Sequence, residues 1–430
     1  MTVYCVIGAG AAGMSALVQL TQAGYDVDCF EKSDRVGGHW NTDYDALHLI
    51  TSRDMTGFEG FPMPTDYPYF PRRDQVRDYL GSYAREHGLY EKVRFGVEVV
   101  AVSPRPSAGP LGSAGWTVTL STGERRDYDG VFVANGHLWD QKVPAIGADF
   151  TGTQVHSGSY RNPSDIAGRR VLVVGAGNSG CDLAVDAAQH RFEVDIVMRE
   201  GMFFQPKSYF GVPRQEIAWL AGFSPEEQDF LARMLAKVSI GEAKDYAGMP
   251  APKAATLAEG KAVVNDLLLY WVQHGRVHIR PAIDRIDGTT VHFSDGTSGE
   301  YDTILWATGF HVSLPFLDET LLERRAAVPL RYGGGIVPKG LEKLYFIGLT
   351  APRGPQLPIY GVQTKLAIRM LDLHERAGGF APLAAYLGEL QDADDRVDIV
   401  RLTWLEQLAD TERLLDAFAL SRAGALSTAG

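Results

Sequence analysis

Two stretches of this 430-residue chain repeat one spacing of glycines that suits the binding of a dinucleotide. The glycines of the two copies are Gly8, Gly10 and Gly13, then Gly175, Gly177 and Gly180. In this motif the first glycine permits a tight turn, the second lets the backbone approach a pyrophosphate, and the third lets a helix pack closely on a strand. The helix N-terminus then faces the phosphates. Two dinucleotide sites in one chain indicate electron transfer between a nicotinamide and a flavin.

The sequence around the first glycine run predicts a strand, a turn and a helix. An apolar run at 3–7 precedes Gly8, an amphipathic helical pattern covers 12–23, and a strand pattern covers 25–30. Glu31 ends that second strand, about 20 residues beyond the glycines, where the ribose of a dinucleotide needs an acceptor. This context is the one that the motif requires, so the first copy predicts a dinucleotide site.

The second copy differs at the position that corresponds to Glu31. Met198 occupies it, and Arg199 follows. Loss of the carboxylate together with a new guanidinium suits the 2′-phosphate of NADPH. We therefore assign FAD to the first site and NADPH to the second. Glu200 is adjacent and weakens this charge argument, and the alternative is that Arg199 only ends a strand in solvent.

A second repeat closes each half of this arrangement. Residues 117–136 and 290–309 share a strand pattern T-V-x-x-S-x-G, a Tyr-Asp pair, and an apolar run that ends in a turn of small residues. Each copy predicts a hairpin strand followed by a buried parallel strand. We expect the chain to cross between its two domains soon after Gly136 and again soon after Gly309.

Composition narrows the class of protein. A chain of this length, with 45% hydrophobic residues, is expected to form two or three domains. A net charge of −12 argues against nucleic acid as a partner. No stretch approaches the roughly 20 apolar residues of a membrane helix, and the chain enters its first strand at once, leaving no room for a signal peptide. These features favour a cytoplasmic protein that does not bind a membrane.

The three cysteines, Cys5, Cys29 and Cys181, are dispersed along the chain. This usage favours a reducing compartment and no disulfide framework. It also excludes a closely spaced redox pair beside a flavin, and with it the disulfide-reductase class. The sequence shows no metal-ligand cluster and no serine triad.

Between the two glycine runs, residues 150–160 match the pattern F-x-G-x-x-x-H-x-x-x-[FY], through His156 to Tyr160. This stretch resembles the fingerprint of the flavin-containing monooxygenases, the class B flavoprotein monooxygenases. The related Baeyer–Villiger enzymes end the fingerprint in tryptophan. Residues 307–310 (Ala-Thr-Gly-Phe) are similar to a second motif of the family. The resemblance runs from Met1 to about Arg369.

The resemblance implies a chemistry that the cofactors carry. NADPH reduces FAD, oxygen adds at flavin C4a to give a hydroperoxide, and an amine nitrogen or a sulfur of a small molecule takes the distal oxygen. The protein must exclude water from this site. Baeyer–Villiger oxygenation of a ketone is one alternative, and an uncoupled NADPH oxidase or flavin redox sensor is another. A homodimer is also a family-based expectation.

The same resemblance places residues along each cofactor. Those expected to contact FAD are Gly8, Gly10, Ala11, Ala12, Gly13, Glu31, Lys32, Gly38, His39, Trp40, Thr51 and Gln363. Those expected to contact NADP are Gly175, Gly177, Asn178, Ser179, Gly180, Cys181, Asp182 and Arg199, with Lys207 a weaker phosphate candidate.

One position departs from the family pattern. Family members have an asparagine close to flavin C4a, and alignment on residues 53–55 puts Ile50 in that slot. Isoleucine has no amide with which to hydrogen-bond a peroxide or NADP⁺. Either Thr51 or Ser52 acts as the catalytic substitute, or the oxygenated flavin is less protected here and leaks hydrogen peroxide.

The expected fold is α/β, with two doubly wound dinucleotide-binding domains. The FAD domain is expected to be discontinuous, covering 1–165 and 300–430 with the C-terminal helices. The NADP domain covers 166–299 and carries an aromatic-rich insertion at 201–280. A role in positioning the domain junction is favoured for His156, a structural role for His48, and His137 could face solvent or the nicotinamide.

Overall fold

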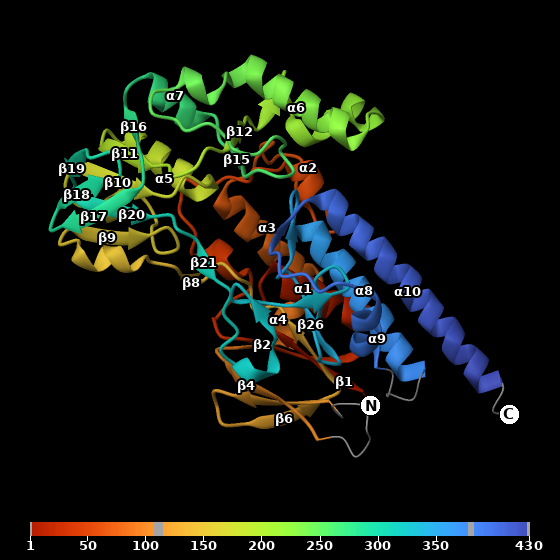
Figure 1. Ribbon diagram of the computed structural model, residues 1–430. Coiled ribbons are helices and arrows are strands. Elements are labelled where there is room, and N and C mark those ends of the chain that lie inside the picture. Colours follow the sequence, from red (N-terminus) through yellow and green to blue (C-terminus); the bar gives the residue numbers. More distant parts are fainter. Residues whose placement is uncertain (1, 107–114, 377–381, 428–430) are drawn as a thin grey trace.

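The computed structural model describes residues 2–106, 115–376 and 382–427 and shows two lobes, each built on a five-stranded parallel sheet (Figure 1). The first sheet has the order β26-β7-β1-β2-β3. Its strands are β1 (Val3–Ile7), β2 (Asp26–Glu31), β3 (Val93–Phe95), β7 (Gly130–Val133) and β26 (Leu344–Phe346). The second sheet has the order β16-β11-β10-β20-β9. Its strands are β9 (Thr153–His156), β10 (Arg170–Val174), β11 (Glu193–Val197), β16 (Val277–Arg280) and β20 (Thr303–Trp306).

The two sheets repeat one topology, because each glycine run follows the central strand of its own sheet. β1 pairs with β2 on one side and β7 on the other, and β10 pairs in the same way with β11 and β20. β7 and β20 are buried along their whole length and β10 at its three central residues, as expected for parallel strands covered on both faces. The predicted doubly wound α/β class is therefore confirmed.

Helices cover both sheets. In the first lobe they are α1 (Ala11–Gln22), α2 (Arg53–Thr56), α3 (Arg73–Glu86), α4 (Leu89–Lys92), α8 (Leu357–Arg376), α9 (Leu383–Leu390) and α10 (Arg401–Ser427). In the second lobe α5 (Asn178–Gln189) and α7 (Leu267–Gln273) pack on the sheet, and α6 (Pro225–Ile240) lies above it (Figure 1). α1 packs along α8, so the C-terminal part of the chain completes the core of the first lobe. No helix of the described ranges is both long and apolar enough to cross a membrane.

The second repeat forms the expected hairpins. β5 (Trp116–Leu120) lies between β4 (Val99–Pro104) and β6 (Arg125–Tyr128), and β18 (Thr290–Phe293) lies between β17 (Ile283–Asp287) and β19 (Ser298–Glu300). Each hairpin leads into the buried strand that follows it, β7 or β20. The repeat predicted from the sequence is therefore a structural repeat.

The chain crosses between the lobes through two short strands that pair with each other. β8 (Asp140–Gln141) and β21 (Phe310–His311) are antiparallel, directly after the Gly136 and Gly309 turns. The expected crossing points are confirmed, but the domain boundaries after 165 and after 299 are wrong. β9 and β20 lie outside 166–299 and yet pair in the second sheet with β10, because β20 fills the slot that β7 fills in the first sheet.

His156 holds this junction together. Its Nε2 lies 3.0 Å from the carbonyl oxygen of Gly309, and its Nδ1 accepts a hydrogen bond from the Gly158 amide at 3.1 Å. Because Nδ1 accepts, Nε2 carries the proton, and the ring is neutral with both nitrogens occupied. Burial lowers the pKa of His156. The positioning role expected for this residue agrees with these contacts.

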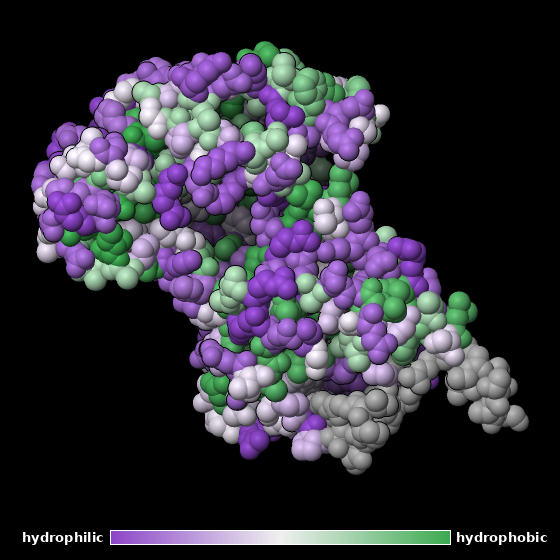
Figure 2. Space-filling model, in the orientation of Figure 1, coloured by the Kyte–Doolittle hydropathy of each residue, from purple (hydrophilic) through white to green (hydrophobic). Residues whose placement is uncertain are grey.

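The insertion extends the second lobe above the groove between the lobes. It contains the ribbon β12 (Phe203–Gln205) with β15 (Ala262–Val264), the short pair β13 (Ser208–Tyr209) with β14 (Val212–Pro213), and α6. Figure 2 shows the surface hollowed between the two lobes. Phe204 and Tyr209 are buried, whereas Phe210, Trp219 and Phe223 are exposed, so the aromatic run of the insertion is divided between core and surface.

Candidate functional site

The first glycine turn has the geometry of a phosphate cradle. Gly8 has a φ of +98°, and a Cβ at this residue would lie 2.7 Å from the Ala134 carbonyl oxygen. A Cβ at Gly13 would lie 1.8 Å from the carbonyl oxygen of Gly8, so α1 approaches the turn more closely than any side chain allows. At Gly10, by contrast, the Cα of Gly38, at 3.8 Å, is the single described atom that a Cβ would meet. The backbone is therefore packed tightly on one side and open on the other.

The second turn reproduces this arrangement. Gly175 has a φ of +106°, and its Cβ would lie 2.4 Å from the Ala307 carbonyl oxygen. A Cβ at Gly180 would lie 1.9 Å from the carbonyl oxygen of Gly175, while at Gly177 no described atom lies within 4 Å. Gly10 and Gly177 are the N-caps of α1 and α5, and neither helix has a side-chain cap. The amides of both first turns are thus left to bind an anion, and both turns fit a pyrophosphate.

Glu31 lies beside the first turn. Its Oε2 accepts a hydrogen bond from the Ala9 amide at 2.7 Å, and its Oε1 accepts one from the Ser33 amide at 2.8 Å. The buried carboxylate therefore ends β2 next to the glycines, as the sequence predicts. A carboxylate oxygen has capacity for a further donor, so a ribose hydroxyl can bind without displacing either amide.

Residues 38–40 border the same turn through the Gly38–Gly10 contact. His39 places Nδ1 2.6 Å from Oδ2 of Asp43, and its ring lies against Trp40 with centroids 5.1 Å apart. Lys32 is exposed, and its ammonium lies 4.6 Å from the ring centroid of Trp139.

His137 lies on the side of the first turn rather than the second. Burial lowers the pKa of this residue to about 4, and His39 adds to the shift while the Gly348 backbone opposes it. His137 is therefore neutral near pH 7, close to both groups. His48 places its Nδ1 2.9 Å from the Ala46 carbonyl oxygen, a contact that agrees with the structural role expected of this residue.

The hydroxyls of Thr51 and Ser52 have different surroundings. Thr56 donates its hydroxyl proton to the Ser52 carbonyl at 2.6 Å, so at the 2.7 Å contact between the two threonine hydroxyls Thr51 must be the donor. The Ser52 Oγ is buried and has no hydrogen-bond partner among the described residues. Of the two residues expected to substitute for the missing amide at Ile50, Ser52 is the one with an uncommitted donor.

Gln363 is fully buried on α8, and both ends of its amide are in use. Its Oε1 accepts from the Gly348 amide at 2.8 Å, and its Nε2 donates to the Thr350 carbonyl at 3.0 Å. Gln363 therefore fixes the loop that follows β26. That Gln363 approaches the isoalloxazine stays a prediction. Because both ends of its amide bind the loop, any effect of Gln363 on the flavin would act through the position of this loop.

At the second turn, Asp182 joins three parts of the chain. Its Oδ2 accepts a hydrogen bond from the Tyr44 hydroxyl at 2.9 Å. Its Oδ1 accepts one from the side-chain amide of Asn265, Nδ2, at 2.7 Å. Tyr44 belongs to the first half of the chain but packs in the core of the second lobe. Asn178 adds a further tie, since its Oδ1 accepts from the Val264 amide at 2.9 Å. The first turn of α5 is thus held from both sides. Cys181 is buried in the same turn, and burial raises its pKa, so it is an unreactive thiol.

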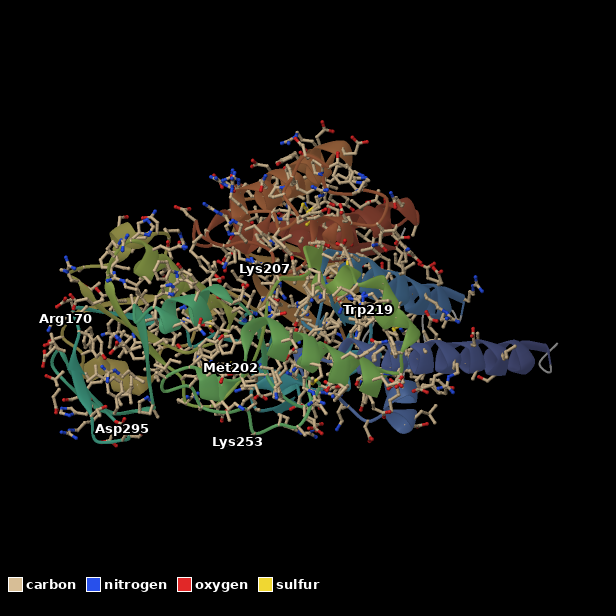
Figure 3. The ribbon with its side chains drawn as sticks, turned by 90° about the horizontal axis from the view of Figure 1, so that it is seen from above. Arg170, Met202, Lys207, Trp219, Lys253 and Asp295 are labelled. Carbon is tan, nitrogen blue, oxygen red and sulfur yellow. The ribbon has the colours of Figure 1, made fainter. Side chains whose placement is uncertain are left out.

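Lys207 lies where the two lobes meet (Figure 3). It is half-buried, burial lowers its pKa, and the carboxylates of Asp182 and Asp266 oppose that shift. Its ammonium lies 5.5 Å from the ring centroid of Phe70, which belongs to the first lobe. The sequence favoured a solvated lysine here, whereas the structure places a partly desolvated cation close to the second turn.

Arg199 is exposed just beyond β11, in a basic cluster that the sequence did not reveal. Lys261 places its ammonium 3.3 Å from Glu200 Oε2, and this contact, with Lys253 and Arg199, lowers the pKa of Glu200. Lys253 and Lys261 are distant in sequence, so only folding brings them here. A Cβ at Gly201 would lie 2.1 Å from the backbone of residue 251, which shows how closely the two segments pack.

Comparison with known proteins identifies the family. The model of the family described as flavin-binding monooxygenase-like matches residues 2–377, and the chain belongs to this family. Flavin-containing monooxygenase 5 of Oryctolagus cuniculus is 30% identical over 389 residues, which cover 84% of this chain and 72% of that protein. An open crystal structure of cyclohexanone monooxygenase has a TM-score of 0.70 at 18% identity and covers 98% of each chain.

One structural neighbour was solved with two nucleotide cofactors bound. A crystal structure of OTEMO in complex with FAD and NADP has a TM-score of 0.66 at 20% identity and covers 87% of this chain and 84% of that one. The protein is a flavin-dependent monooxygenase of this family. The family resemblance drawn from the fingerprint and the glycine turns is confirmed.

The two glycines of the second turn are expected to respond differently to a methyl group. Gly180→Ala forces a backbone shift and lowers the free energy of unfolding by about 2 kcal/mol, with loss of NADP⁺ binding. Gly177→Ala meets open space at a φ of −69° and keeps its stability, but its methyl blocks the approach of a pyrophosphate. Chemical unfolding and NADP⁺ titration of the FAD-loaded variants measure both effects. Equal stability of the two variants would contradict the close packing of α5.

Asp182 is expected to give the protein a characteristic pH dependence. Burial raises its pKa to about 6, so between about pH 4 and pH 6 the folded state binds a proton that the unfolded chain has released. The contribution of Asp182 to the free energy of unfolding therefore falls as pH rises through this window, by at most about 3 kcal/mol, and is flat above it. Asp182→Asn removes this slope. Urea unfolding of both proteins from pH 4 to pH 8 tests it, and a difference between them that stays constant from pH 4 to pH 6 would contradict the assignment.

Proposed function

We propose that this monooxygenase oxygenates a soft nucleophile, an amine nitrogen or a sulfur, of a small molecule. The observation that carries the choice is Tyr160, which ends the fingerprint where Baeyer–Villiger enzymes have tryptophan. Tyr160 is fully buried, and its hydroxyl donates to Asp186 Oδ2 at 2.8 Å. A tryptophan would be larger and would not reproduce this contact. Ketone oxygenation is the second candidate, supported by the structural likeness to cyclohexanone monooxygenase.

The two turns supply the binding sites for the cofactors. The amides of α1 and the carboxylate of Glu31 would hold the pyrophosphate and ribose of FAD, and the amides of α5 would hold the pyrophosphate of NADPH. The 2′-phosphate would lie among the side chains of Arg199, Lys253 and Lys261. It would compete there with the Glu200 carboxylate, which forms an ion pair with Lys261. When bound, the flavin accepts a hydride from NADPH and activates oxygen for transfer.

The chain's own contribution is to position the cofactors and to control polarity near them. Tyr44 and Asn265 hold the first turn of α5 through Asp182, which sets where the nicotinamide nucleotide lies against the first lobe. Ser52 would donate a hydrogen bond where the family uses an asparagine amide, because its buried hydroxyl has no other partner among the described residues. Ile50 excludes water but donates nothing, so partial uncoupling to hydrogen peroxide belongs to the proposal.

The basic cluster predicts selectivity for NADP⁺ over NAD⁺. Lys261→Ala and Arg199→Ala should each weaken NADP⁺ binding at least about tenfold, because a charged hydrogen bond to the 2′-phosphate contributes roughly 1.5–3 kcal/mol. NAD⁺, which has no 2′-phosphate, is the matched control and should bind each variant as it binds the unmodified protein. Calorimetric titration of both nucleotides measures the ratio. An equal loss for the two nucleotides would refute a specific contact with the 2′-phosphate.

Rapid mixing of the NADPH-reduced protein with oxygen tests the reaction itself. The expected result is a flavin absorbance transient that NADP⁺ prolongs and that a thioether or tertiary amine discharges. Part of the NADPH should then yield the oxygenated product and the remainder hydrogen peroxide. Direct return to oxidised flavin with hydrogen peroxide, in the presence of these nucleophiles, would instead favour an oxidase or sensor. Ile50→Asn should lengthen the transient, and Ser52→Ala should shorten it.

A further inference from the structure

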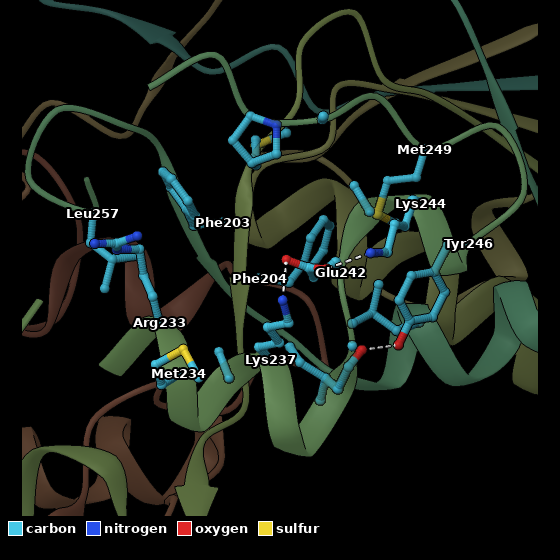
Figure 4. A pocket seen from close by; sticks show the side chains of 18 residues that line it. Phe203, Phe204, Arg233, Met234, Lys237, Glu242, Lys244, Tyr246, Met249 and Leu257 are labelled. Atoms are coloured by element: carbon cyan, nitrogen blue, oxygen red, sulfur yellow. Dashed lines mark hydrogen bonds and ion pairs between the residues drawn. The ribbon is translucent and has the colours of Figure 1, made fainter. Parts of the chain in front are cut away.

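A cavity of about 540 Å³ lies within the insertion, and no residue of either glycine turn lines it. α6 forms one wall, the segment Met202–Phe204 another, and the loop at 241–252 a third (Figure 4). The lining is mainly apolar and includes Met202, Met234 and Met249 with two phenylalanines. Cavities that bind small molecules have volumes of roughly 300–1,000 Å³ and such linings. Methionine side chains adapt readily to the shape of an apolar ligand.

The charged side chains of this cavity carry a positive excess. Two ammonium groups share one carboxylate, since Lys237 Nζ lies 3.1 Å from Glu242 Oε1 and Lys244 Nζ lies 2.9 Å from Glu242 Oε2 (Figure 4). Arg233 is balanced separately by Asp229, 2.7 Å away. The Asp245 carboxylate also attracts Lys244, but Asp245 is exposed and does not line the cavity, so among the lining groups two lysine charges face the single carboxylate of Glu242. Both lysines are at least half exposed, so their ammonium groups can turn toward a ligand.

We propose that this cavity is a binding site for an amphipathic monoanion, a medium-chain carboxylate in its simplest form. The alkyl chain would lie among the methionines and phenylalanines, where its burial contributes about 0.8 kcal/mol per CH₂ group. The carboxylate would bind the surplus ammonium charge of Lys237 and Lys244. A cationic amphiphile of the same length meets two lysines and is disfavoured.

This site is separate from the FAD site. All the lining residues lie between Met202 and Leu269, within the second lobe and its insertion, whereas the FAD candidates lie on the first lobe. The ribbon of β12 and β15 stands between the cavity and α5, because Phe204 lines the cavity while the Val264 amide donates to Asn178. A ligand here would not contact the flavin, so the site does not depend on the identity of the oxygenated substrate.

Calorimetric titration of the FAD-loaded protein with decanoate tests the proposal, with decylamine as the matched ligand of opposite charge. Decanoate should bind at one site without changing the flavin spectrum, and at least tenfold tighter than decylamine. The double variant Lys237→Gln/Lys244→Gln should weaken decanoate at least tenfold. Ala236→Phe, which fills the cavity from α6, should abolish binding. Lys339→Gln, which removes a surface lysine paired with Glu323 elsewhere, is the control and should change nothing.

Three results would overturn the proposal. The first is equal affinity for decylamine and decanoate. The second is decanoate binding that survives both the lysine and the Ala236 substitutions. The third is binding that perturbs the flavin spectrum, because that would locate the ligand in the oxygenation site. Thermal unfolding and FAD content establish that each variant is folded. If Ala236→Phe does not fold, the double lysine variant decides, because its side chains are at the surface.

Discussion

The close approach of each nucleotide-binding helix to the turn before it is the constraint on which the rest of the structure depends. At Gly13 and at Gly180, a carbonyl oxygen lies where a Cβ would be, so there is no room for a methyl group. Only this contact lets α1 and α5 begin at the carboxyl ends of β1 and β10 with their first amides open to an anion. Because both lobes meet the same demand in the same way, the chain holds two dinucleotide cradles of nearly identical geometry.

A monooxygenase of this kind needs its two cradles in a fixed relation, and two sets of contacts provide it. The paired crossings β8 and β21, with His156 bound to Gly309, join the lobes along the backbone. On the other side of the second turn, Tyr44 crosses from the first half of the chain into the core of the second lobe and binds Asp182. The buried carboxylate costs solvation energy, which appears as its raised pKa, and its two hydrogen bonds offset that cost.

The insertion has at least two structural roles, and they lie on different sides of its ribbon. Toward α5, the ribbon fixes Asn178 and Asp182, and the segments that flank it bring Lys253 and Lys261 to Arg199. Away from α5, it helps to enclose the apolar cavity under α6. The aromatic run that looked like one feature in the sequence is therefore divided among a core, a cavity wall and an exposed surface.

The sequence by itself determined the features that depend on local backbone geometry and short-range pattern. These are the two glycine turns, the helices and strands around them, the repeated hairpins and the crossings after Gly136 and Gly309. Tertiary structure decided what depends on contacts between distant segments. Periodicity describes a strand but does not name its partner, so β9 and β20 were expected in the wrong domain. For the same reason only the folded chain shows that the Gln363 amide binds a loop and that two distant lysines lie near Arg199. It also shows that the Ser52 hydroxyl has no partner within the described part of the chain.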